Sequence, residues 1–417
     1  MRITLILFIL FCSNVSSHAQ LYFKSTLQAN QDKTYQNLIQ NTIHKNLKAD
    51  PDSLTEWDWM GAFTALEVLQ YKSPFVDSRI AVAVNDIQNR SETYQRALLE
   101  LLFTNYPNLY YEPVKFLLIQ TSHPKIFAMC ANYILVSDKG LEDLNFLKVK
   151  TEQLLLKKSA DPILKMLQYQ LSQHGIAEAK PSLSAFFSKN FLPGQNVILS
   201  IQRKNRDYPG LILIRDGRGN FVKDSTGAYF NVPQLGRSIT NLPAYLTNGN
   251  TPQGIYRMRG YDVSRSIFIG PTVNVQLSMP FECKASVFYQ NDALPDSAFS
   301  LSTYQNLLPP SFRNYFPLFE SYYAGKAGRS EIIIHGSTLN PDYYAGKPYY
   351  PLVPTMGCLT SYESWDPKTG QRKLSDQQKI INALIPIGGA KGYAVVIEIN
   401  DEDKPVTLND VLSFLPK

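Results

Sequence analysis

The spacing of apolar residues changes near Pro181, and this change constrains the fold more than any other feature. Before Pro181, apolar side chains such as Ala62, Ala65 and Leu69 recur at helical spacing. After it, short apolar or alternating runs typical of β-strands follow one another. One regular architecture cannot satisfy both patterns. The sequence therefore predicts an α+β multidomain protein, in which an all-α helical array precedes a β-rich domain.

Residues 20–182 make up the predicted helical domain. Helices are expected at 79–89, 91–103, 113–120, 124–136, 144–157 and 162–173, with prolines near their edges. A capping box over Ser53-Leu-Thr-Glu56 predicts the start of an earlier helix. Many short helices in succession favour a stacked, HEAT-like array, although no repeated residue pattern supports the repeat.

Residues 183–417 make up the predicted β-rich domain. Strands are expected at 196–202, 210–216, 220–224, 266–270, 274–279, 285–289, 331–336 and 393–399. A turn signal at Asp216–Asn220 predicts a hairpin. Helices are expected at 375–385 and 408–415. The stretch 291–328, rich in Tyr and Phe around Pro309-Pro310, is interpreted as a long insertion or lid.

The first residues carry the features of an export signal. A single Arg2 precedes an apolar run at 3–12, and small residues follow up to Ala19. Residues 1–19 are therefore predicted to be a cleaved signal peptide. The run falls short of the roughly 18 residues that a membrane span needs. We expect an exported protein of the periplasm or cell envelope, without a stable membrane span.

Charge and motif content narrow the classes of partner. Charged residues make up 18% of the chain, and the formal net charge of +6 is scattered. A nucleic-acid footprint would be a concentrated basic patch, whereas this balance suits an anionic cell-wall polymer. No Gly-rich run precedes a Lys-Ser/Thr pair, so no phosphate loop is expected. One histidine and two cysteines after residue 182 are too few for a zinc site. We expect no cofactor, no metal and no nucleic acid.

The cysteines and the histidine of the β-rich domain suggest chemistry. Three cysteines follow the signal peptide, so at least one thiol stays free. Cys130, on an apolar helix face, and Cys283, in a β segment, are interpreted as packed residues. Cys358 follows Gly357, whose flexibility allows a tight turn with N–H groups directed at an oxyanion. His335 can take the thiol proton. The pair is a candidate nucleophile and base, although a Gly-Cys step is also common around inert thiols.

The sequence around this pair resembles the catalytic motif of the L,D-transpeptidases, the YkuD-like cysteine enzymes of bacterial cell walls. That family has a His-Gly step after a strand and then a Ser/Thr-x-Gly-Cys step, which here are His335-Gly336 and Thr355-Met356-Gly357-Cys358. Upstream, Thr251-Pro-Gln-Gly254 and the following Tyr256 match the family's Thr-Pro-x-Gly-aromatic stretch. The resemblance covers about 210–400, and its landmarks come in the family's order. Met356 stands where the family usually has His, and Thr360 where it usually has Arg or Asn.

The resemblance implies acyl transfer on peptidoglycan stem peptides through a thioester on Cys358. His335 would be the base, oriented by the carbonyl of Gly336. Candidate oxyanion or substrate contacts are Gly357, Thr355, Met356, Ser337, Thr338 and Thr360. Two other functions stay open: an L,D-carboxypeptidase or other thiol hydrolase of wall peptides, and a non-catalytic wall-binding protein.

Two further regions have alternative interpretations. The tyrosines between base and nucleophile, at 343, 344, 349 and 350, either line a substrate cleft or pack in the interior. The helical domain carries no recognisable chemistry and is a candidate docking surface for the glycan, an envelope protein partner or the catalytic domain.

Overall fold

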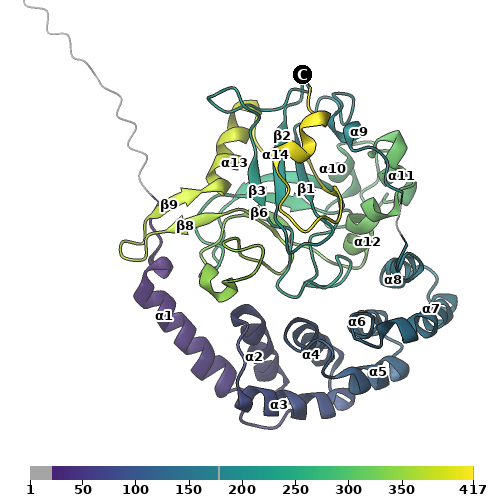
Figure 1. Ribbon diagram of the computed structural model, residues 1–417. Helices are drawn as coiled ribbons and strands as arrows, with labels where there is room; N and C mark the ends of the chain where they lie inside the picture. Colours follow the sequence, from purple (N-terminus) through teal and green to yellow (C-terminus); the bar gives the residue numbers. More distant parts are fainter. Residues whose placement is uncertain (1–20, 177–178, 417) are drawn as a thin grey trace, which may run out of the picture.

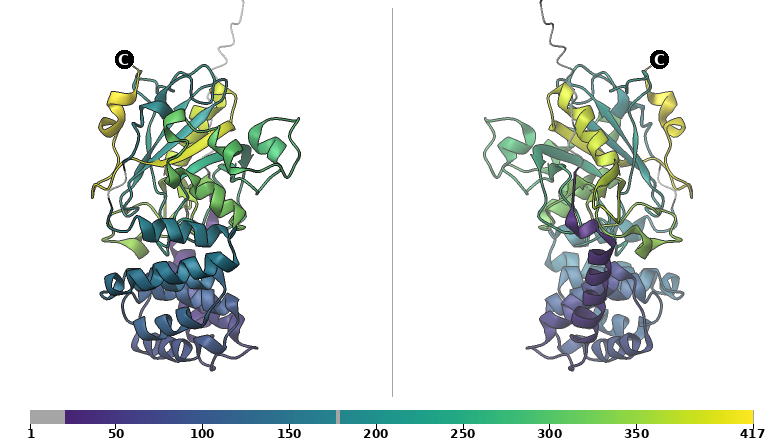
Figure 2. Two further views of the ribbon diagram at one scale, coloured as in Figure 1. Left: turned by 90° about the vertical axis from the view of Figure 1, so that its right-hand side faces the viewer. Right: turned by 90° about the vertical axis from the view of Figure 1, so that its left-hand side faces the viewer.

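The computed structural model describes residues 21–176 and 179–416. An arc of helices lies beneath a β-rich body, and the two side views show the same stacking (Figures 1 and 2). The architecture is therefore α+β, with the helices first in sequence, as the sequence predicts. The predicted signal peptide, 1–19, lies outside the described residues.

The helices of the arc correspond closely to the predicted segments. They are α1 (Gln28–Asn37), α2 (Glu56–Leu69), α3 (Pro74–Asn85), α4 (Glu92–Asn105), α5 (Tyr111–Gln120), α6 (Pro124–Leu135), α7 (Gly140–Lys157) and α8 (Pro162–Ser172). Proline occupies the first turn of α3, α6 and α8, where its missing N–H costs no helical hydrogen bond. The sequence did not predict α1, because it is mostly polar and buries no residue.

The predicted capping box is wrong. Helix α2 begins at Glu56, and Thr55 is its N-cap without a side-chain cap. The Thr55 hydroxyl instead accepts a hydrogen bond from the Asp52 N–H at 2.8 Å. The Glu56 carboxylate accepts from the N–H of Ser91 at 3.1 Å and from its hydroxyl at 2.5 Å. Tertiary contact with the start of α4 has replaced the local cap.

Eight strands form one sheet in the order β3-β2-β1-β10-β4-β5-β6-β7. They are β1 (Val197–Gln202), β2 (Gly210–Arg215), β3 (Val232–Gln234), β4 (Gly254–Asp262), β5 (Asn274–Ser278), β6 (Ile333–His335), β7 (Leu359–Thr360) and β10 (Lys391–Glu398). The pairs β1–β10 and β6–β7 are parallel, and the others are antiparallel. Leu235, just after β3, exchanges backbone hydrogen bonds of 2.8 and 2.9 Å with Thr360. The two edge strands thus meet, and the sheet nearly closes into a barrel.

Both faces of this sheet are covered. Helix α13 (Asp376–Leu384) packs on one face, against a cluster that includes Ile334 and Leu359. The opposite face carries His335 and Thr360, because neighbouring residues of a strand point to opposite sides. The His335 side of the sheet is therefore the one turned away from α13.

Three expectations for the β-rich domain need correction. Residues 285–289 form helix α10 (Ala285–Tyr289), and 266–270 form a turn, so neither is a strand. The segment 220–224 makes only isolated bridges. A short apolar run has no periodicity that distinguishes a strand from a buried helical turn, which explains the error at 285–289.

The second half of the segment 291–328, from Tyr304 to Gly325, contributes buried side chains to the core and is not a lid, whereas residues 291–300 contain no buried residue. The segment contains α11 (Leu301–Gln305) and α12 (Glu320–Lys326). Tyr304 is fully buried, and its hydroxyl accepts a hydrogen bond of 2.8 Å from the N–H of Ile255 in β4. A Cβ at Gly254 would lie 2.4 Å from that hydroxyl, so this glycine permits the close approach.

The helical arc is attached to the β-rich body at both ends. At its start, the N–H of Phe23 donates to the carbonyl of Gly370 at 2.8 Å, beside the hairpin β8 (Glu363–Trp365) and β9 (Arg372–Ser375). At its end, the ring of Tyr169 in α8 stacks on Phe316, with centroids 4.1 Å apart. One hydrophobic cluster runs through both regions. The arc is therefore packed against the body along its length.

Candidate functional site

The sheet brings His335 and Cys358 to adjacent strands. His335 ends β6 and pairs with Thr360 in the parallel strand β7. Cys358 directly precedes β7, and its Sγ donates to the carbonyl of Glu331, two residues before β6 begins. The register thus places the thiol at the start of the β6–β7 pair and the imidazole at the end of β6. No hydrogen bond joins the two among the described residues, as is common for catalytic pairs without substrate.

His335 is a buried, neutral base. Its Nδ1 lies 2.5 Å from the carbonyl oxygen of Gly336, which can only accept, so Nδ1 carries the hydrogen. Nε2 is then the nitrogen with a free lone pair. Burial lowers the pKa of His335 to about 4, and the hydrogen bond to Gly336 acts in the opposite direction. The predicted orienting role of the Gly336 carbonyl matches this geometry.

Cys358 is partly exposed and is a thiol at neutral pH. Its Sγ donates to the carbonyl of Glu331 at 3.3 Å. Burial raises the pKa of Cys358 to about 11, whereas the N–H of Ile333 and the charge of Arg329 favour the thiolate. Since His335 is neutral as well, the resting pair is a thiol beside an imidazole rather than an ion pair.

Two threonine hydroxyls fix the turn before Cys358. Thr355 Oγ1 accepts from the N–H of Gly357 at 3.0 Å and donates to the carbonyl of Cys358 at 3.0 Å. Thr251, from the Thr-Pro-Gln-Gly stretch, donates to the carbonyl of Gly357 at 2.8 Å. The Gly357 N–H is therefore already engaged. The N–H of Cys358 has no hydrogen-bond acceptor among the described residues and is the better candidate oxyanion donor.

Two residues that the sequence did not single out surround this pair. Arg329 is buried directly against Gly357, and Glu363 is packed against Gly336. Burial raises the pKa of Glu363 to about 7, and a hydrogen bond from Ser375 lowers it less. No short motif could have indicated these contacts, because the residues that meet are far apart in sequence and are brought together by strand pairing and by loops.

The other predicted contact residues have structural partners. Ser337 and Thr338 donate their hydroxyls to the carbonyls of Phe268 and Ile267, at 3.2 and 2.6 Å. The buried Thr360 donates to the carbonyl of Val353 at 2.8 Å. Met356 is 38% exposed and Ser337 is partly exposed, whereas Thr338 and Thr360 are buried. The three hydroxyls thus hold the loops that flank the site.

The tyrosine-rich stretch connects the site to the helices. Tyr344 and Tyr349 are buried in one small cluster, so for these two the packing interpretation is correct. The Tyr344 hydroxyl donates to the carbonyl of Val68 in α2 at 2.9 Å. The ring of Tyr343 lies 5.7 Å from that of Tyr35 in α1. Tyr350 is 45% exposed. The stretch is therefore mainly a contact between the two regions.

A polar cavity lies over the ends of β4, β5 and β6. It measures about 470 Å³ and is lined by Asp262, Val263, Ser264, Arg265, Asn274, Gln276 and Ile333. Gln276 pairs with Ile333, and the register of β6 and β7 continues that row to Cys358. The cavity therefore opens on the His335 side of the sheet, one strand from Cys358. Amide, hydroxyl and charged groups line it, which suits a polar, peptide-like ligand.

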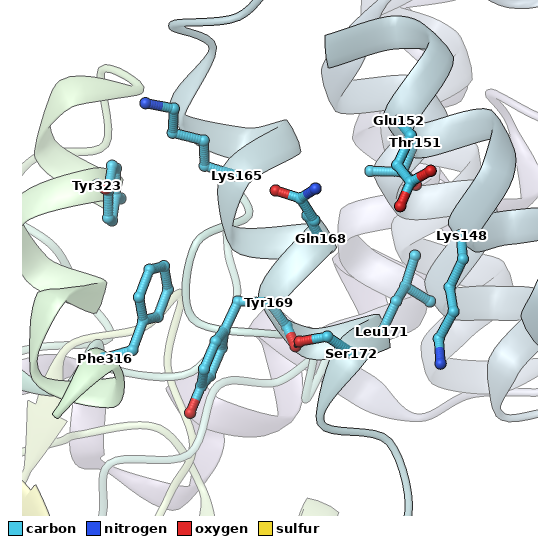
Figure 3. A pocket seen from close by; sticks show the side chains of 10 residues that line it. All are labelled: Lys148, Thr151, Glu152, Lys165, Gln168, Tyr169, Leu171, Ser172, Phe316 and Tyr323. Carbon is cyan, nitrogen blue, oxygen red and sulfur yellow. The ribbon is translucent and has the colours of Figure 1, made fainter.

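A second cavity, of about 500 Å³, lies between α7, α8 and the segment 316–323 (Figure 3). Lys148 and Lys165 line it together with the aromatic rings of Tyr169, Phe316 and Tyr323. Its lining contains no cysteine or histidine. Neither cavity is lined by His335 or Cys358, and only the first has a lining residue, Ile333, in the strand that carries His335.

Comparison of the chain with protein-family models, with curated proteins and with solved structures gives no match. Within residues 21–176 and 179–416, no group of three or more His, Cys, Asp or Glu could hold a metal ion. Over the same ranges, no helix has the length and apolar character to cross a membrane. Function must therefore be inferred from the residues of the site.

Proposed function

We propose that the protein is a cysteine acyltransferase that acts on peptidoglycan stem peptides, similar to the L,D-transpeptidases. One observation carries the proposal: the parallel pairing of β6 and β7 brings His335, the last residue of β6, near Cys358, which directly precedes β7. The His-Gly step and the Gly-Cys step lie apart in sequence, and strand pairing brings them close together in space. A chance Gly-Cys step would have no reason to lie beside the domain's single histidine.

The reaction would begin from the neutral pair. Nε2 of His335 takes the proton from the Cys358 thiol as Sγ attacks the carbonyl carbon of the substrate peptide bond. Because the imidazole has a pKa of about 4 and the thiol one of about 11, proton transfer before attack is strongly unfavourable. Proton transfer is therefore coupled to carbon–sulfur bond formation, or follows closure of the site by substrate.

The tetrahedral intermediate needs a donor for its oxyanion. The N–H of Cys358 is the free donor of the turn, and such a bond is typically worth about 3–4 kcal/mol in the transition state. Collapse breaks the C–N bond, and the leaving amine takes the proton from His335. A thioester on Cys358 remains. An amine of a second stem peptide attacks this thioester to form a cross-link, and the thiol is regenerated.

Water could replace the amine as acceptor, which gives the L,D-carboxypeptidase alternative. The partial exposure of Cys358 and the polar lining of the cavity are compatible with either acceptor. Product analysis with a tetrapeptide substrate separates them, because hydrolysis yields stem tripeptide without a cross-linked dimer.

The test of the proposal is covalent capture of the nucleophile. Wild-type protein is incubated with a carbapenem, and the adduct is located by mass spectrometry; Cys358→Ala and Cys283→Ala are the comparison variants. The expected result is an adduct on Cys358 in the wild type and in Cys283→Ala, but not in Cys358→Ala. The contrary result is a folded wild type that binds muropeptides as Cys358→Ala does, but forms no adduct and releases no product. The protein would then be a wall-binding protein instead.

A further inference from the structure

Arg329 lies between α12 and β6 and is only 9% exposed. Its guanidinium donates to the carbonyls of Ala244, Gly249 and Asn250, the last at 2.8 Å. These acceptors are neutral, so they satisfy the N–H groups of the guanidinium without cancelling its charge. Burial lowers the pKa of Arg329 to about 10, which still leaves it protonated at neutral pH.

The guanidinium packs directly against the turn that carries the nucleophile. A Cβ at Gly357 would lie 1.9 Å from Nη2 of Arg329 and 2.6 Å from the carbonyl oxygen of Gly249. The φ of Gly357 is +113°, a conformation that residues with a Cβ rarely adopt. Gly357 is therefore required both for the turn and for the approach of the charge, one residue from Cys358.

The other charges near Cys358 oppose the formation of a thiolate. Glu331 and Glu282 both raise the pKa of the thiol, whereas Arg329 lowers it. His335 is neutral at rest, and the hydroxyl of Thr360 carries no charge. Arg329 is thus the cation that faces the sulfur from the elements packed around it.

We propose that Arg329 is a positioning residue, which holds a fixed positive charge beneath the Gly357–Cys358 turn and stabilises the sulfur as it becomes negative. The inference rests on the proposed role of Cys358 as a nucleophile and adds a group that the motif does not contain. It also explains why three backbone carbonyls converge on one arginine: they fix the position of its charge. A pre-oriented charge in a buried site needs no reorganisation during the reaction.

The test is the pH dependence of Cys358 alkylation by iodoacetamide, with the modified peptide quantified by mass. Rates are measured from pH 7 to 10, where a thiol of high pKa reacts about tenfold faster per pH unit. Arg329→Gln is expected to slow alkylation of Cys358 on the order of tenfold between pH 7 and 9, because a nearby opposite charge shifts a pKa by one or more units. The difference should shrink towards pH 10, where Arg329 itself begins to lose its proton. Arg329→Lys keeps the charge and should retain most of the wild-type rate.

Two control variants separate charge from structure. Arg215 is also a buried arginine with a pKa lowered to about 10, and it donates to the carbonyls of Ser188 and Phe191. It lies at the end of β2 away from β7, so Arg215→Gln should lower the melting temperature without changing the alkylation profile. Glu331→Gln removes a negative charge near Cys358 and should accelerate alkylation.

The outcomes distinguish this inference from the proposed function. An Arg329→Gln profile equal to that of the wild type, or a folded Arg329→Lys as slow as Arg329→Gln, overturns the role of the charge. If Arg329→Gln does not fold, failure of Glu331→Gln to accelerate alkylation overturns it as well. Alkylation needs no turnover, so shifted profiles in a protein that processes no muropeptide would refute the enzyme and leave the electrostatic role standing.

Discussion

Replacing Gly336 by alanine tests how the base is held. A Cβ at this position would lie 2.1 Å from Cδ, 2.3 Å from Oε2 and 2.6 Å from Cγ of Glu363. Ordinary contacts of a Cβ begin at about 3.4 Å, so either Glu363 or the Gly336 backbone must move by roughly 1 Å or more. The effect is steric, because Gly336 is not among the residues with a positive φ.

Glu363 is held in place more firmly than the loop. Its side chain is fully buried, and Oε1 accepts a hydrogen bond of 2.5 Å from the Ser375 hydroxyl. Arg372 lies 3.8 Å from the same oxygen. The Gly336 peptide should therefore move instead of Glu363, and it would displace the carbonyl that accepts the hydrogen bond from His335. Overpacking of this kind costs about 1–3 kcal/mol. We expect a lower free energy of unfolding and a carbapenem acylation rate reduced on the order of tenfold.

A double-mutant cycle with Glu363→Ala isolates the clash. Truncating Glu363 removes the atoms that the new methyl group meets, so Gly336→Ala should cost at least about 1 kcal/mol less in that background. Gly61 in α2 is the matched control. Its Cβ would meet only Asn46 Nδ2, at 3.8 Å, so Gly61→Ala should be neutral or stabilise by up to about 1 kcal/mol. Chemical denaturation gives the unfolding free energies of Gly336→Ala, Glu363→Ala, the double variant and Gly61→Ala relative to the wild type. Additivity within about 0.5 kcal/mol would show that the contact does not limit the position of the Gly336 peptide.

Three other predictions concern the base, the turn and the attachment of the helices. Burial lowers the pKa of His335 to about 4 from a usual value near 6.5, so its contribution to stability is present above about pH 6.5 and is lost as the pH falls towards 4. In urea denaturation between pH 7 and pH 4, the wild type should lose up to about 3 kcal/mol of unfolding free energy that His335→Gln does not lose. An equal dependence of the unfolding free energy on pH in both proteins would contradict a buried neutral base. Thr355→Val removes a hydroxyl with two hydrogen bonds in the turn, and should cost about 1–3 kcal/mol and slow carbapenem acylation; an unchanged rate would show that the turn holds without it. Tyr344→Phe removes the hydrogen bond to Val68 and should cost about 1 kcal/mol in thermal melting, whereas Tyr350→Phe, at an exposed side chain, should cost little; equal effects would exclude a specific role for Tyr344.

Prediction from sequence succeeded where the signal is local. The helices of the arc have apolar residues at helical spacing and prolines near their ends, and each of these signals can be read within one short segment of sequence. The strands β1, β2 and β10 were found because each is a short, mostly apolar run, and β5 because its apolar and polar residues alternate. His335 and Cys358 were found because each stands beside a glycine in a short motif. Their placement on adjacent parallel strands is a property of the register, which no local pattern encodes.

Prediction failed where partners come from distant segments. Arg329 and Glu363 have unremarkable neighbours in sequence, and their importance depends on contacts with Gly357 and Gly336. The segment 291–328 suggested a lid because it is irregular and aromatic, but burial of rings such as Tyr304 makes its second half part of the core. Irregular backbone can still be interior when side chains and backbone satisfy its polar groups, as the Tyr304 hydroxyl does for Ile255.

Besides the tyrosine-rich stretch, a second loop connects the helical arc to the turn at Cys358. On its outer side, the loop at 242–251 contacts three helices. Asn248 donates to Glu100 in α4 at 3.0 Å, Lys125 in α6 donates to Thr247 at 2.9 Å, and Tyr245 donates to Gln170 in α8 at 2.6 Å.

The inner side of the same loop contacts the turn at Cys358. Three of its backbone carbonyls accept hydrogen bonds from Arg329, and the Thr251 hydroxyl donates a hydrogen bond to the carbonyl of Gly357. A displacement of the arc would therefore move the charge and the backbone beneath Cys358 together. This connection gives the helices a structural reason to accompany the β-rich domain, although they contribute no side chain to the candidate pair: they fix the loop that packs against the turn at Cys358.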